Sequence, residues 1–345
     1  MDLALLSGRG RILVVNAGST SLKLAVVDEA GEVEHVTDLA AARSDVDAVA
    51  HRVVHGGARF REPVVFDDGV EAELRELTQL APLHNAPALE ALAQVRTALP
   101  DVPQIAVFDT AFHATLPEQA FTYALPERLR ALGVRRYGFH GLSVQWAAEQ
   151  VSVPRLVVCH LGGGCSVTAV RDGRSVDTTM GLTPLEGVPM VTRSGSVDPG
   201  ALLFLLRGGH ATVDELDHVL EHESGLLGLA GTNDVTELER RDDATARLAL
   251  GVLAYRVAGA VAAMTVALGG IDALVFTAGI GEGSALVRAL VCKRLGFLGV
   301  ELDEDVNAAA EPDAELARAG TAVRIVVLRA REELVIAREA RRLLA

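Results

Sequence analysis

The amino-acid sequence predicts an α/β protein composed of two domains that share one fold. The chain has 345 residues, which is longer than one hydrophobic core usually supports. Half of its residues are hydrophobic and 33 are glycine, a composition typical of folded proteins with helices and strands. A pattern of strands and tight turns near the N-terminus returns near the middle of the chain, which indicates a duplication.

The duplicated pattern links residues 12–27 with residues 156–170. The stretch ILVVNAGSTSLKLAVV superimposes on LVVCHLGGGCSVTAV, so that Asn16 meets His160. Each copy reads as a strand, a turn of small residues, a second strand, another turn and a third short strand. Chance similarity between two hairpins is the alternative. A real duplication predicts two domains around a central cleft, into which the glycine turns would direct N–H groups toward phosphates.

The boundary between the predicted domains lies near residues 146–155, where Pro154 precedes the second copy. We therefore expect one domain over residues 1–150 and another over residues 151–330. A helix at about 331–345 is expected to pack back on the first domain. Apolar patterns predict a strand at residues 323–328 and helices at residues 86–99, 143–150, 198–207, 244–268, 284–294 and 330–343.

The charge balance is acidic, with 32 lysines and arginines against 46 aspartates and glutamates and a net charge of −14. Such a chain lacks the basic excess that neutralises nucleic-acid phosphates, so we expect no nucleic-acid partner. An acidic protein that binds anions has to gather its arginines locally. The positions of arginine and histidine are therefore more informative than their number.

The chain has three cysteines, Cys159, Cys165 and Cys292, and no CxxC pair. This pattern favours a reduced, cytoplasmic setting without a disulfide framework or a cysteine zinc site. The first residues, MDLALLSGRGR, lack a charged segment followed by a long apolar one, so no signal peptide is expected. The apolar segment 248–268 contains Arg256, and it predicts a buried core helix rather than a membrane span.

Polar residues end several predicted strands of the first domain. Asn16 precedes a turn of glycine and hydroxyl residues, and Lys23 lies on the next strand; a phosphate can approach there, although plain hairpins use similar residues. Arg52 lies in an apolar strand, where its charge requires either an anionic ligand or a buried ion pair. Asp109 ends another strand, where α/β folds place catalytic groups, or it caps the following turn.

Two further segments place cations near glycine. In RRYGFHG, His140 lies between Phe139 and a glycine, while Arg135 and Arg136 add positive charge. A purely structural histidine is the alternative there. Arg193 lies in a polar, glycine-bearing loop. We interpret both segments as candidates for binding an anion.

Two glycine-rich turns belong to the second domain. HLGGG (160–164) follows the first strand of the second copy. FTAGIGEG (276–283) predicts a strand, a glycine loop and a helix, which directs N–H groups at an anion, although tight turns also need glycine. Glu332 or Glu333 opens the last helix, where a glutamate either serves a site or compensates the helix dipole.

Together these stretches resemble the acetate kinase family, within the acetokinase, heat-shock chaperone and actin superfamily. The resemblance extends from residue 12 to the last helix. It implies two duplicated domains of a ribonuclease H-like fold with a central cleft. It also implies a kinase that catalyses reversible, Mg²⁺-dependent phosphoryl transfer between ATP and acetate, giving acetyl phosphate and ADP, as a cytoplasmic homodimer. The motifs that carry it are VNAGSTSLK, HRVVHGG, LAPLHN, FDTAFH, RRYGFHG, HLGGG, DTTMGLTPLEG, TRSG with DPG, FTAGIGE and EELVIARE.

The resemblance implies a role for each candidate residue. Because a carboxylate acceptor is already ionised, Asp109 would orient groups rather than abstract a proton. Cationic donors would neutralise the charge of the transferring phosphoryl group. The implied roles are magnesium binding for Asn16 and Glu332, carboxylate binding for Arg52, and catalysis for Asp109, His140 and Arg193. The implied nucleotide-binding residues are Lys23, His160, Leu161, Gly162, Gly163, Gly164, Asp234, Val235, Thr236, Gly279, Ile280, Gly281, Glu282 and Gly283.

The nucleotide-binding motifs depart from the family pattern. Gly163 and Gly283 stand where the family usually has asparagine, and Thr236 stands where it has arginine. Val191 replaces a typical glycine, AREE replaces TNEE before the last helix, and the chain is shorter than usual. These departures predict relaxed nucleotide choice or a phosphoryl donor other than ATP. The alternatives are a propionate or butyrate kinase, a sugar kinase, and a non-catalytic ligand sensor of the same fold.

Overall fold

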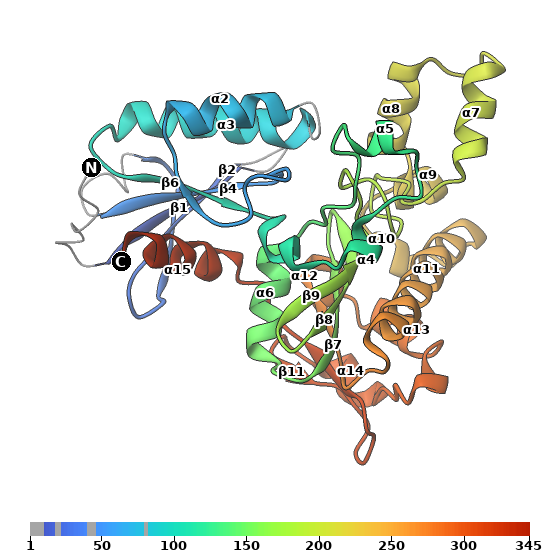
Figure 1. Ribbon diagram of the computed structural model, residues 1–345. Coiled ribbons are helices and arrows are strands. Elements are labelled where there is room, and N and C mark those ends of the chain that lie inside the picture. The colour runs from blue at the N-terminus through green and yellow to red at the C-terminus, as the bar shows by residue number, and fades with distance from the viewer. Residues whose placement is uncertain (1–9, 18–21, 40–45, 79–81) are drawn as a thin grey trace. The chain divides into compact units, whose positions relative to one another are not determined.

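The structure is a computed structural model that describes residues 10–17, 22–39, 46–78 and 82–345 (Figure 1). The chain forms two compact units, each with one six-stranded sheet. Unit 1 contains Met1–Ala114, Phe139–Trp146 and Arg331–Ala345, and unit 2 contains Thr115–Gly138 and Ala147–Ala330.

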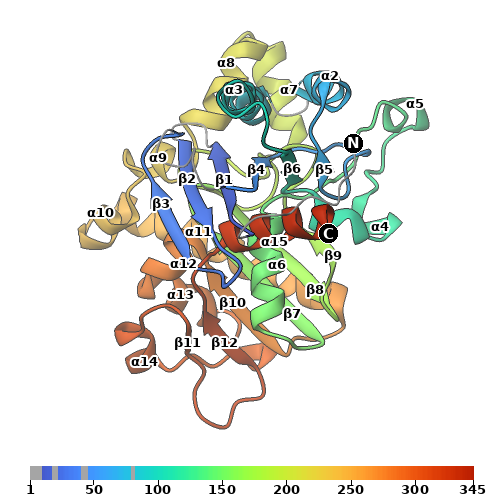
Figure 2. The ribbon, with the colours of Figure 1, turned by 90° about the vertical axis from the view of Figure 1, so that its left-hand side faces the viewer.

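The sheet of unit 1 consists of β1 (Ile12–Ala17), β2 (Leu22–Val27), β3 (Val33–Val36), β4 (Ala48–Val53), β5 (Val64–Val65) and β6 (Gln104–Phe108). Its strand order is β3-β2-β1-β4-β6-β5 (Figure 2). β1, β2 and β3 form an antiparallel meander, and β4 and β6 continue the sheet parallel to β1. β5 pairs antiparallel with β6 at the edge.

Helices cover both faces of this sheet. α2 (Asp68–Leu77) and α3 (Pro82–Ala98) lie over one face, and α15 (Glu332–Leu344) packs on β1 and β4 at the other (Figure 1). Residues 12–15 of β1 are therefore all buried, as expected for a strand that packs on both sides. On the α3 side, Leu13 and Val15 form a cluster with Val95 and Leu99.

The sheet of unit 2 consists of β7 (Arg155–Leu161), β8 (Cys165–Arg171), β9 (Arg174–Thr178), β10 (Ala273–Thr277), β11 (Ala314–Glu315) and β12 (Arg324–Val327). Its order, β9-β8-β7-β10-β12-β11, repeats the order of unit 1 strand for strand. The directions also repeat, with an antiparallel meander, two parallel strands and an antiparallel edge strand. The predicted α/β class with a duplicated fold is confirmed.

Each of the six helices predicted from the periodic patterns is present, and the described residues also form eight α-helices that those patterns did not predict. The expected strand at 323–328 is β12. Outside the sheets the structure contains α4 (Glu118–Phe121), α5 (Glu127–Arg130), α6 (Gly141–Gln150), α7 (Pro199–Arg207), α8 (Val213–His222), α9 (Gly225–Ala230), α10 (Val235–Arg240), α11 (Ala244–Leu268), α12 (Ala278–Gly283), α13 (Ala285–Cys292), α14 (Glu304–Ala309) and the 3₁₀ turns Ala111–Thr115 and Gly296–Leu298.

By length and composition, α11 could cross a membrane, because its mean hydropathy over 18 residues is 1.7. Half of that window is buried in the fold, and the helix packs on β7, β8 and β9. Asp243 caps its first turn, and Gly269 ends it with a positive φ of 71°. The helix is thus a core element of unit 2.

The units differ from the expected boundary near residue 150 in one segment. Thr115–Gly138 belongs to unit 2, although it precedes the boundary. Thr115 Oγ1 donates to Ser175 O at 2.8 Å, and Tyr137 N donates to Gly181 O at 2.9 Å. These bonds attach the segment to the meander of unit 2 before the chain returns to unit 1 at Phe139.

Candidate functional site

Unit 1 gathers four candidate residues at one end of its sheet. Asn16 and Arg52 are the second-last residues of β1 and β4, and Asp109 directly follows β6. Because these three strands are parallel, their carboxyl ends lie at the same edge. Glu332, the first residue of α15, reaches the same group of side chains.

Arg52 is the centre of this cluster. Its Nε donates to Asp109 Oδ1 at 3.0 Å, its Nη2 donates to Asp109 Oδ2, and its Nη1 donates to Asn16 Oδ1 at 3.1 Å. Glu332 Oε2 lies 3.8 Å from Arg52 Nε. An arginine has five N–H groups, so these three hydrogen bonds leave N–H donors for an anion. The ion-pair alternative for Arg52 is confirmed, and its binding of a ligand stays a prediction.

The electrostatics of the cluster keep Arg52 charged. Burial acts to lower the pKa of Arg52, but the carboxylates of Asp109 and Glu332 outweigh it and raise that pKa. Lys23 lies directly opposite Asn16 in the β1–β2 ladder and is exposed, so it adds a second cation beside the cluster. The glycine and hydroxyl residues of the turn at 18–21 lie outside the described residues.

His140 has a strained backbone next to Asp109. Its φ is 58°, in the left-handed region that residues other than glycine rarely adopt. Gly141 N donates to Asp109 O at 2.9 Å, and a Cβ on Gly141 would lie 2.1 Å from that oxygen. A glycine is therefore required at 141, and the close contact holds the buried His140 beside the strand end. Strain of this kind is typical of functional sites.

Asn85, in the LAPLHN motif, is a structural residue of this site for which no role is expected from the sequence. Asn85 is fully buried, accepts from His55 N at 3.0 Å and donates to His55 O at 3.0 Å. Thr110 Oγ1 accepts from Gly56 N at 3.1 Å, which ties the same loop to the residue after Asp109. These bonds fix the HGG loop that follows Arg52. In the sequence, the available signal was an asparagine directly before the helix predicted at residues 86–99.

In unit 2, the two glycine-rich turns lie side by side. β7 and β10 are parallel neighbours, with His160 opposite Thr277. A Cβ on Gly162 would lie 3.3 Å from Ala278 Cβ and 3.7 Å from Gly279 N, so the turns are in close contact. Gly162 N donates to Gly164 O at 3.0 Å and closes the HLGGG turn. The side chain of His160 is buried at its start.

The second turn differs from the expected glycine loop, because residues 278–283 form the short helix α12. Ala278 opens it with a positive φ of 65°. The carboxylate of Glu282 accepts from Ala278 N at 3.0 Å and from Ala330 N at 2.9 Å. These two bonds hold the helix against the end of β12, so Glu282 acts on the backbone of the turn. Ile280 and Gly281 are buried beneath it.

Side chains also connect α12 to α10. Asp234 Oδ1 caps α10 by accepting from Thr236 N at 2.8 Å. Ser284 caps α13 and donates to Glu239 on α10. Arg288, 1% exposed, donates to Gly281 O at 2.9 Å and Glu282 O at 2.7 Å. The segment Asp234–Thr236 and the α12 turn are therefore held in one framework.

Arg193 is held by partners within unit 2. Its Nε lies 3.2 Å from Glu221 Oε2, and its Nη1 donates to Pro184 O at 3.0 Å. Burial lowers the pKa of Arg193, against the raising effects of Glu221 and of the Cys165 thiol. Cys165 opens β8, and its Sγ lies 3.5 Å from Gly162 O.

Gly163 and Gly283 have open space around them. A Cβ added at either position would meet nothing within 4 Å among the described residues. Neither glycine has a positive φ. The fold therefore does not require glycine at positions 163 and 283. The asparagine amides that the family usually has there are absent without a steric reason.

Arg135 and Arg136, expected to add positive charge near His140, each contact a partner within unit 2. Arg135 stacks over the Phe121 ring at 3.6 Å from its centroid. Arg136 Nη2 donates to Glu186 Oε1 at 2.9 Å, and its Nη1 donates to Thr179 O at 2.7 Å. Both guanidinium groups hold segments of unit 2 together, because each already has a partner.

Comparisons with known proteins agree with this architecture. The profile of the acetokinase family matches residues 35–338. An acetate kinase of Gloeobacter violaceus is 48% identical over 309 residues, covering 86% of this chain and 76% of that protein. An acetate kinase of Arthrobacter sp. is 45% identical and covers 94% of this chain and 97% of that protein. The chain belongs to the acetokinase family.

Solved structures give the same result. A propionate kinase from Francisella tularensis superimposes with a TM-score of 0.89 at 34% identity, covering 95% of this chain and 98% of that one. The acetate kinase of Porphyromonas gingivalis gives 0.88 at 32% identity, covering 97% and 100%. The chain is therefore a phosphotransferase with a carboxyl group as acceptor, and its function is acetate kinase-like.

Proposed function

We propose that the protein catalyses reversible phosphoryl transfer between ATP and acetate. A carboxylate oxygen of acetate attacks the γ-phosphorus, the bond to the β–γ bridging oxygen breaks, and acetyl phosphate and ADP form. No proton has to be removed from the acceptor, because acetate is ionised at neutral pH. The observation that carries the proposal is Arg52 with Asp109 and Asn16 at the ends of parallel strands.

In unit 1 we assign the acceptor to Arg52, which retains N–H donors beyond those used by Asp109 and Asn16. Asp109 holds the guanidinium of Arg52 in one orientation, so its carboxylate is an orienting group rather than a base. His140, strained and next to Asp109, supplies a further polar group for the transferring phosphoryl. Lys23 adds positive charge along the phosphates.

In unit 2 we assign the nucleotide to the two glycine turns, residues 160–164 and 279–283, and to the framework that carries Asp234 and Thr236. Arg193, also in unit 2, neutralises charge on the transferring group. Glycine in the turns allows phosphate oxygens to approach main-chain N–H groups closely.

Magnesium fits the donors that the chain offers in unit 1. Asn16 and Glu332 present amide and carboxylate oxygens around Arg52, and Mg²⁺ prefers oxygen ligands and keeps several waters. The described residues contain no group of three or more His, Cys, Asp or Glu that could form a complete cage. When bound, the ion would neutralise phosphate charge, with Asn16 and Glu332 as its protein contacts.

The phosphoryl donor is proposed to be less restricted than in relatives with the full motifs. Gly163, Thr236 and Gly283 lack the side chains that the family pattern has there, and the glycine positions are open. To test this, the purified protein is assayed for acyl phosphate, trapped as the hydroxamate, with ATP, GTP and pyrophosphate. We expect ATP and GTP to give similar rates. A strong preference for ATP would contradict relaxed donor choice.

The same assay tests the acceptor with acetate, propionate and butyrate. The similarity to a propionate kinase favours a second candidate acceptor of three carbons. Val54 and Pro189, expected near the acyl group, are buried and of small to medium size, while the Leu83 side chain lies outside the described ones. Hydroxamate formation with acetate is the expected result. Its absence with every acceptor would favour a non-catalytic sensor.

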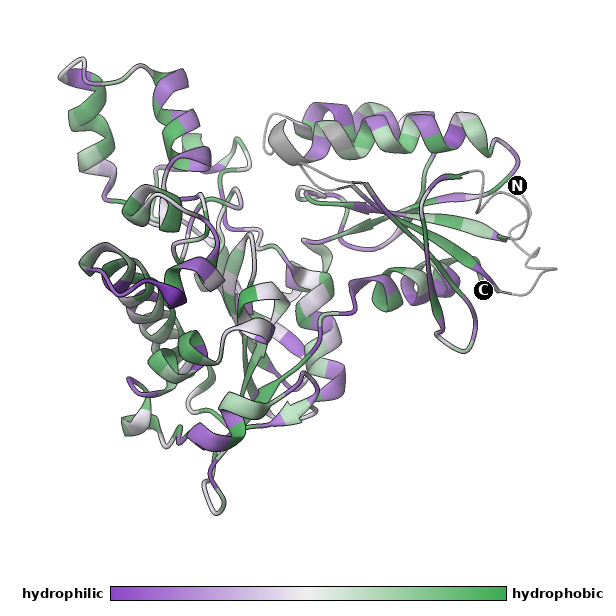
Figure 3. Cartoon of the chain, turned by 180° about the vertical axis from the view of Figure 1, so that it is seen from behind, coloured by the Kyte–Doolittle hydropathy of each residue, from purple (hydrophilic) through white to green (hydrophobic). Residues whose placement is uncertain are grey.

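We also propose a cytoplasmic homodimer. In unit 2, α11 exposes Leu248, Tyr255 and Val266 at helical spacing, with side-chain exposure of 55%, 64% and 82%. α7, which is largely apolar, contains no buried residue (Figure 3). Two such faces would cover each other in a second copy. Tyr255→Lys with Val266→Glu is expected to give monomers in sedimentation experiments; an unchanged dimer would exclude the α11 face.

A further inference from the structure

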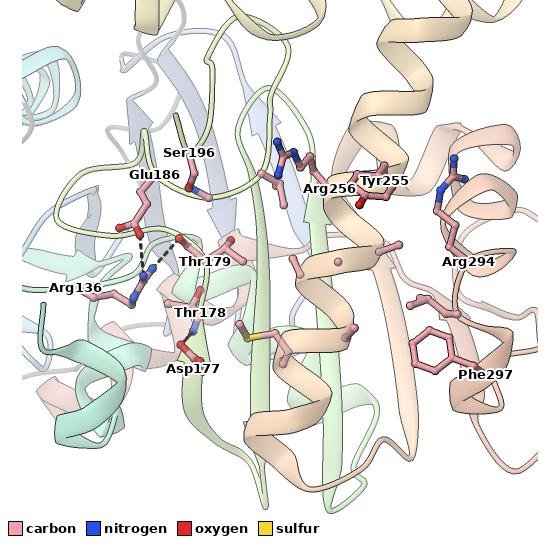
Figure 4. Close-up of a pocket in the computed structure, with 18 residues that line it drawn as sticks. Arg136, Asp177, Thr178, Thr179, Glu186, Ser196, Tyr255, Arg256, Arg294 and Phe297 are labelled. Atoms are coloured by element: carbon pink, nitrogen blue, oxygen red, sulfur yellow. Dashed lines mark hydrogen bonds and ion pairs between the residues drawn. The ribbon is translucent and has the colours of Figure 1, made fainter. Parts of the chain in front are cut away.

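A closed polar network in unit 2 connects residues 123–136 with residues 179–186, which are distant in sequence. Arg136 Nη2 donates to Glu186 Oε1 at 2.9 Å, and the Tyr123 hydroxyl donates to Glu186 Oε2. Both carboxylate oxygens of Glu186 therefore have a partner. The network lies at one end of a cavity of about 800 Å³, where Figure 4 shows Arg136 pointing to Glu186 and Thr179.

The network also binds the main chain around Glu186. Arg136 Nη1 donates to Thr179 O at 2.7 Å and to Met180 O at 2.9 Å, and Leu182 N donates to the Tyr123 hydroxyl at 3.1 Å. A Cβ on Gly181 would lie 1.8 Å from Glu186 Oε2. The segment 179–186 is thus packed against its own charged side chain, with no room for a larger residue at 181.

The main chain of this segment accepts a hydrogen bond from the side chain of Arg193. Arg193 Nη1 donates to Pro184 O at 3.0 Å, two residues before Glu186. Arg193 also forms an ion pair with Glu221, with Nε and Oε2 3.2 Å apart. The direction of the Arg193 guanidinium therefore depends on where the Pro184 carbonyl is held.

The loop that carries Arg193 also begins at the residue after Glu186. Gly187 N donates to Ser196 Oγ at 3.1 Å, and Ser196 N donates to Gly187 O at 2.8 Å, which closes residues 187–196 into a loop. Gly195 has a φ of 67°, and a Cβ there would lie 2.7 Å from Gly187 O. The base of this loop is Gly187, and the carbonyl that accepts from Arg193 belongs to Pro184. Both residues are therefore within two positions of Glu186 in the chain.

We propose that Glu186, held by Arg136 and Tyr123, is the positioning residue for Arg193 in phosphoryl transfer. This inference rests on the proposed function, in which Arg193 neutralises charge on the transferring group. A guanidinium displaced by about 1 Å loses much of that effect, which would cost about a hundredfold in rate. The RRYGFHG motif then contributes Arg136 to unit 2 as a support for Arg193, rather than as an anion-binding group.

The test is a double-mutant cycle on the full chain. Glu186→Gln and Tyr123→Phe are each made alone and together with Arg193→Gln, with acetate and ATP as substrates. We expect Glu186→Gln to lower kcat about tenfold or more, with the KM for acetate within about twofold. In the Arg193→Gln background the same change is expected to add no further loss, because its effect passes through Arg193.

A matched control removes a different ion pair of unit 2. Arg324 and Glu315 form an exposed pair on β12 and β11, and Glu315→Gln is expected to leave kcat unchanged. If Glu186→Gln fails to fold, Tyr123→Phe tests the same network with a smaller change. Unchanged kcat in both network variants, or a loss that persists in the Arg193→Gln background, would overturn the inference. Full turnover in Arg193→Gln alone would instead overturn the proposed role of Arg193.

Discussion

Arg52 and Asp109 form a two-point ion pair between adjacent parallel strands, with the Asp109 side chain only 1% exposed. Each charge compensates the other in a site that water reaches poorly. Loss of one partner leaves the other buried and unpaired, which costs more than the pair itself contributes. Stability and activity are thus coupled at this position, and a pair of substitutions can separate them.

Arg52→Gln is expected to lower kcat/KM for acetate by about a hundredfold or more, because it removes the donor for the acceptor carboxylate. It is also expected to destabilise unit 1 by about 3–5 kcal/mol, because Asp109 stays buried and loses the guanidinium that compensates its charge. Arg52→Gln with Asp109→Asn is expected to regain much of the stability and none of the activity. Thermal unfolding and steady-state kinetics measure the two effects. Full stability in the single variant would contradict the ion-pair argument.

Gly163→Asn and Gly283→Asn test whether the missing amides determine donor choice. Both positions have room and an ordinary φ, so we expect little change in thermal stability. The KM for ATP is expected to fall relative to that for GTP, because each amide adds hydrogen-bonding groups near the nucleotide turns. Gly162→Asn is the matched steric control. A Cβ at position 162 would lie 3.3 Å from Ala278 Cβ, so this glycine, unlike the other two, has little room for a side chain. Identical ATP and GTP constants in all variants would show that these positions do not contact the donor.

The buried His51 predicts a pH dependence of stability. Burial lowers its pKa from 6.5 to about 4, against the raising effect of its hydrogen bond with Gln104. The unfolded chain therefore binds more protons than the folded one between these values, so stability falls as pH decreases from about 6.5 to about 4. His51→Gln is expected to flatten this slope in urea titrations, whereas the exposed control His35→Gln is not. An equal slope in both variants would exclude His51 as the cause.

Glu282→Ala removes the acceptor of two main-chain N–H groups, those of Ala278 and Ala330. We expect a loss of about 1–3 kcal/mol in stability, because two partly buried donors lose their acceptor. We also expect the KM for ATP to rise more than the KM for acetate, because α12 contains the second of the two turns assigned to the nucleotide. The exposed control Glu315→Ala should change neither constant. A larger effect on acetate would place α12 outside the nucleotide site.

The residues of the site differ in how well their roles could be predicted from the sequence. Asn16, Arg52 and Asp109 could be predicted as a group because each lies close to the end of a strand, and parallel strands end at a common edge. Asn85 was missed, because its partner His55 is distant in sequence and no local pattern announces the bond. Arg136 was misread, because a cation beside a histidine looks free until its acidic partner is located.

By itself, the sequence determined the duplication, the class of fold, most strands, six of the helices, and the family. These depend on local periodicity, on turn residues and on the order of motifs, all of which are present in the linear chain. The tertiary structure alone decided that Asp109 holds Arg52, that Glu282 holds α12, and that Thr115–Gly138 belongs to unit 2. Such pairings depend on which surfaces pack together, because a charged side chain takes the partner that the fold brings within reach.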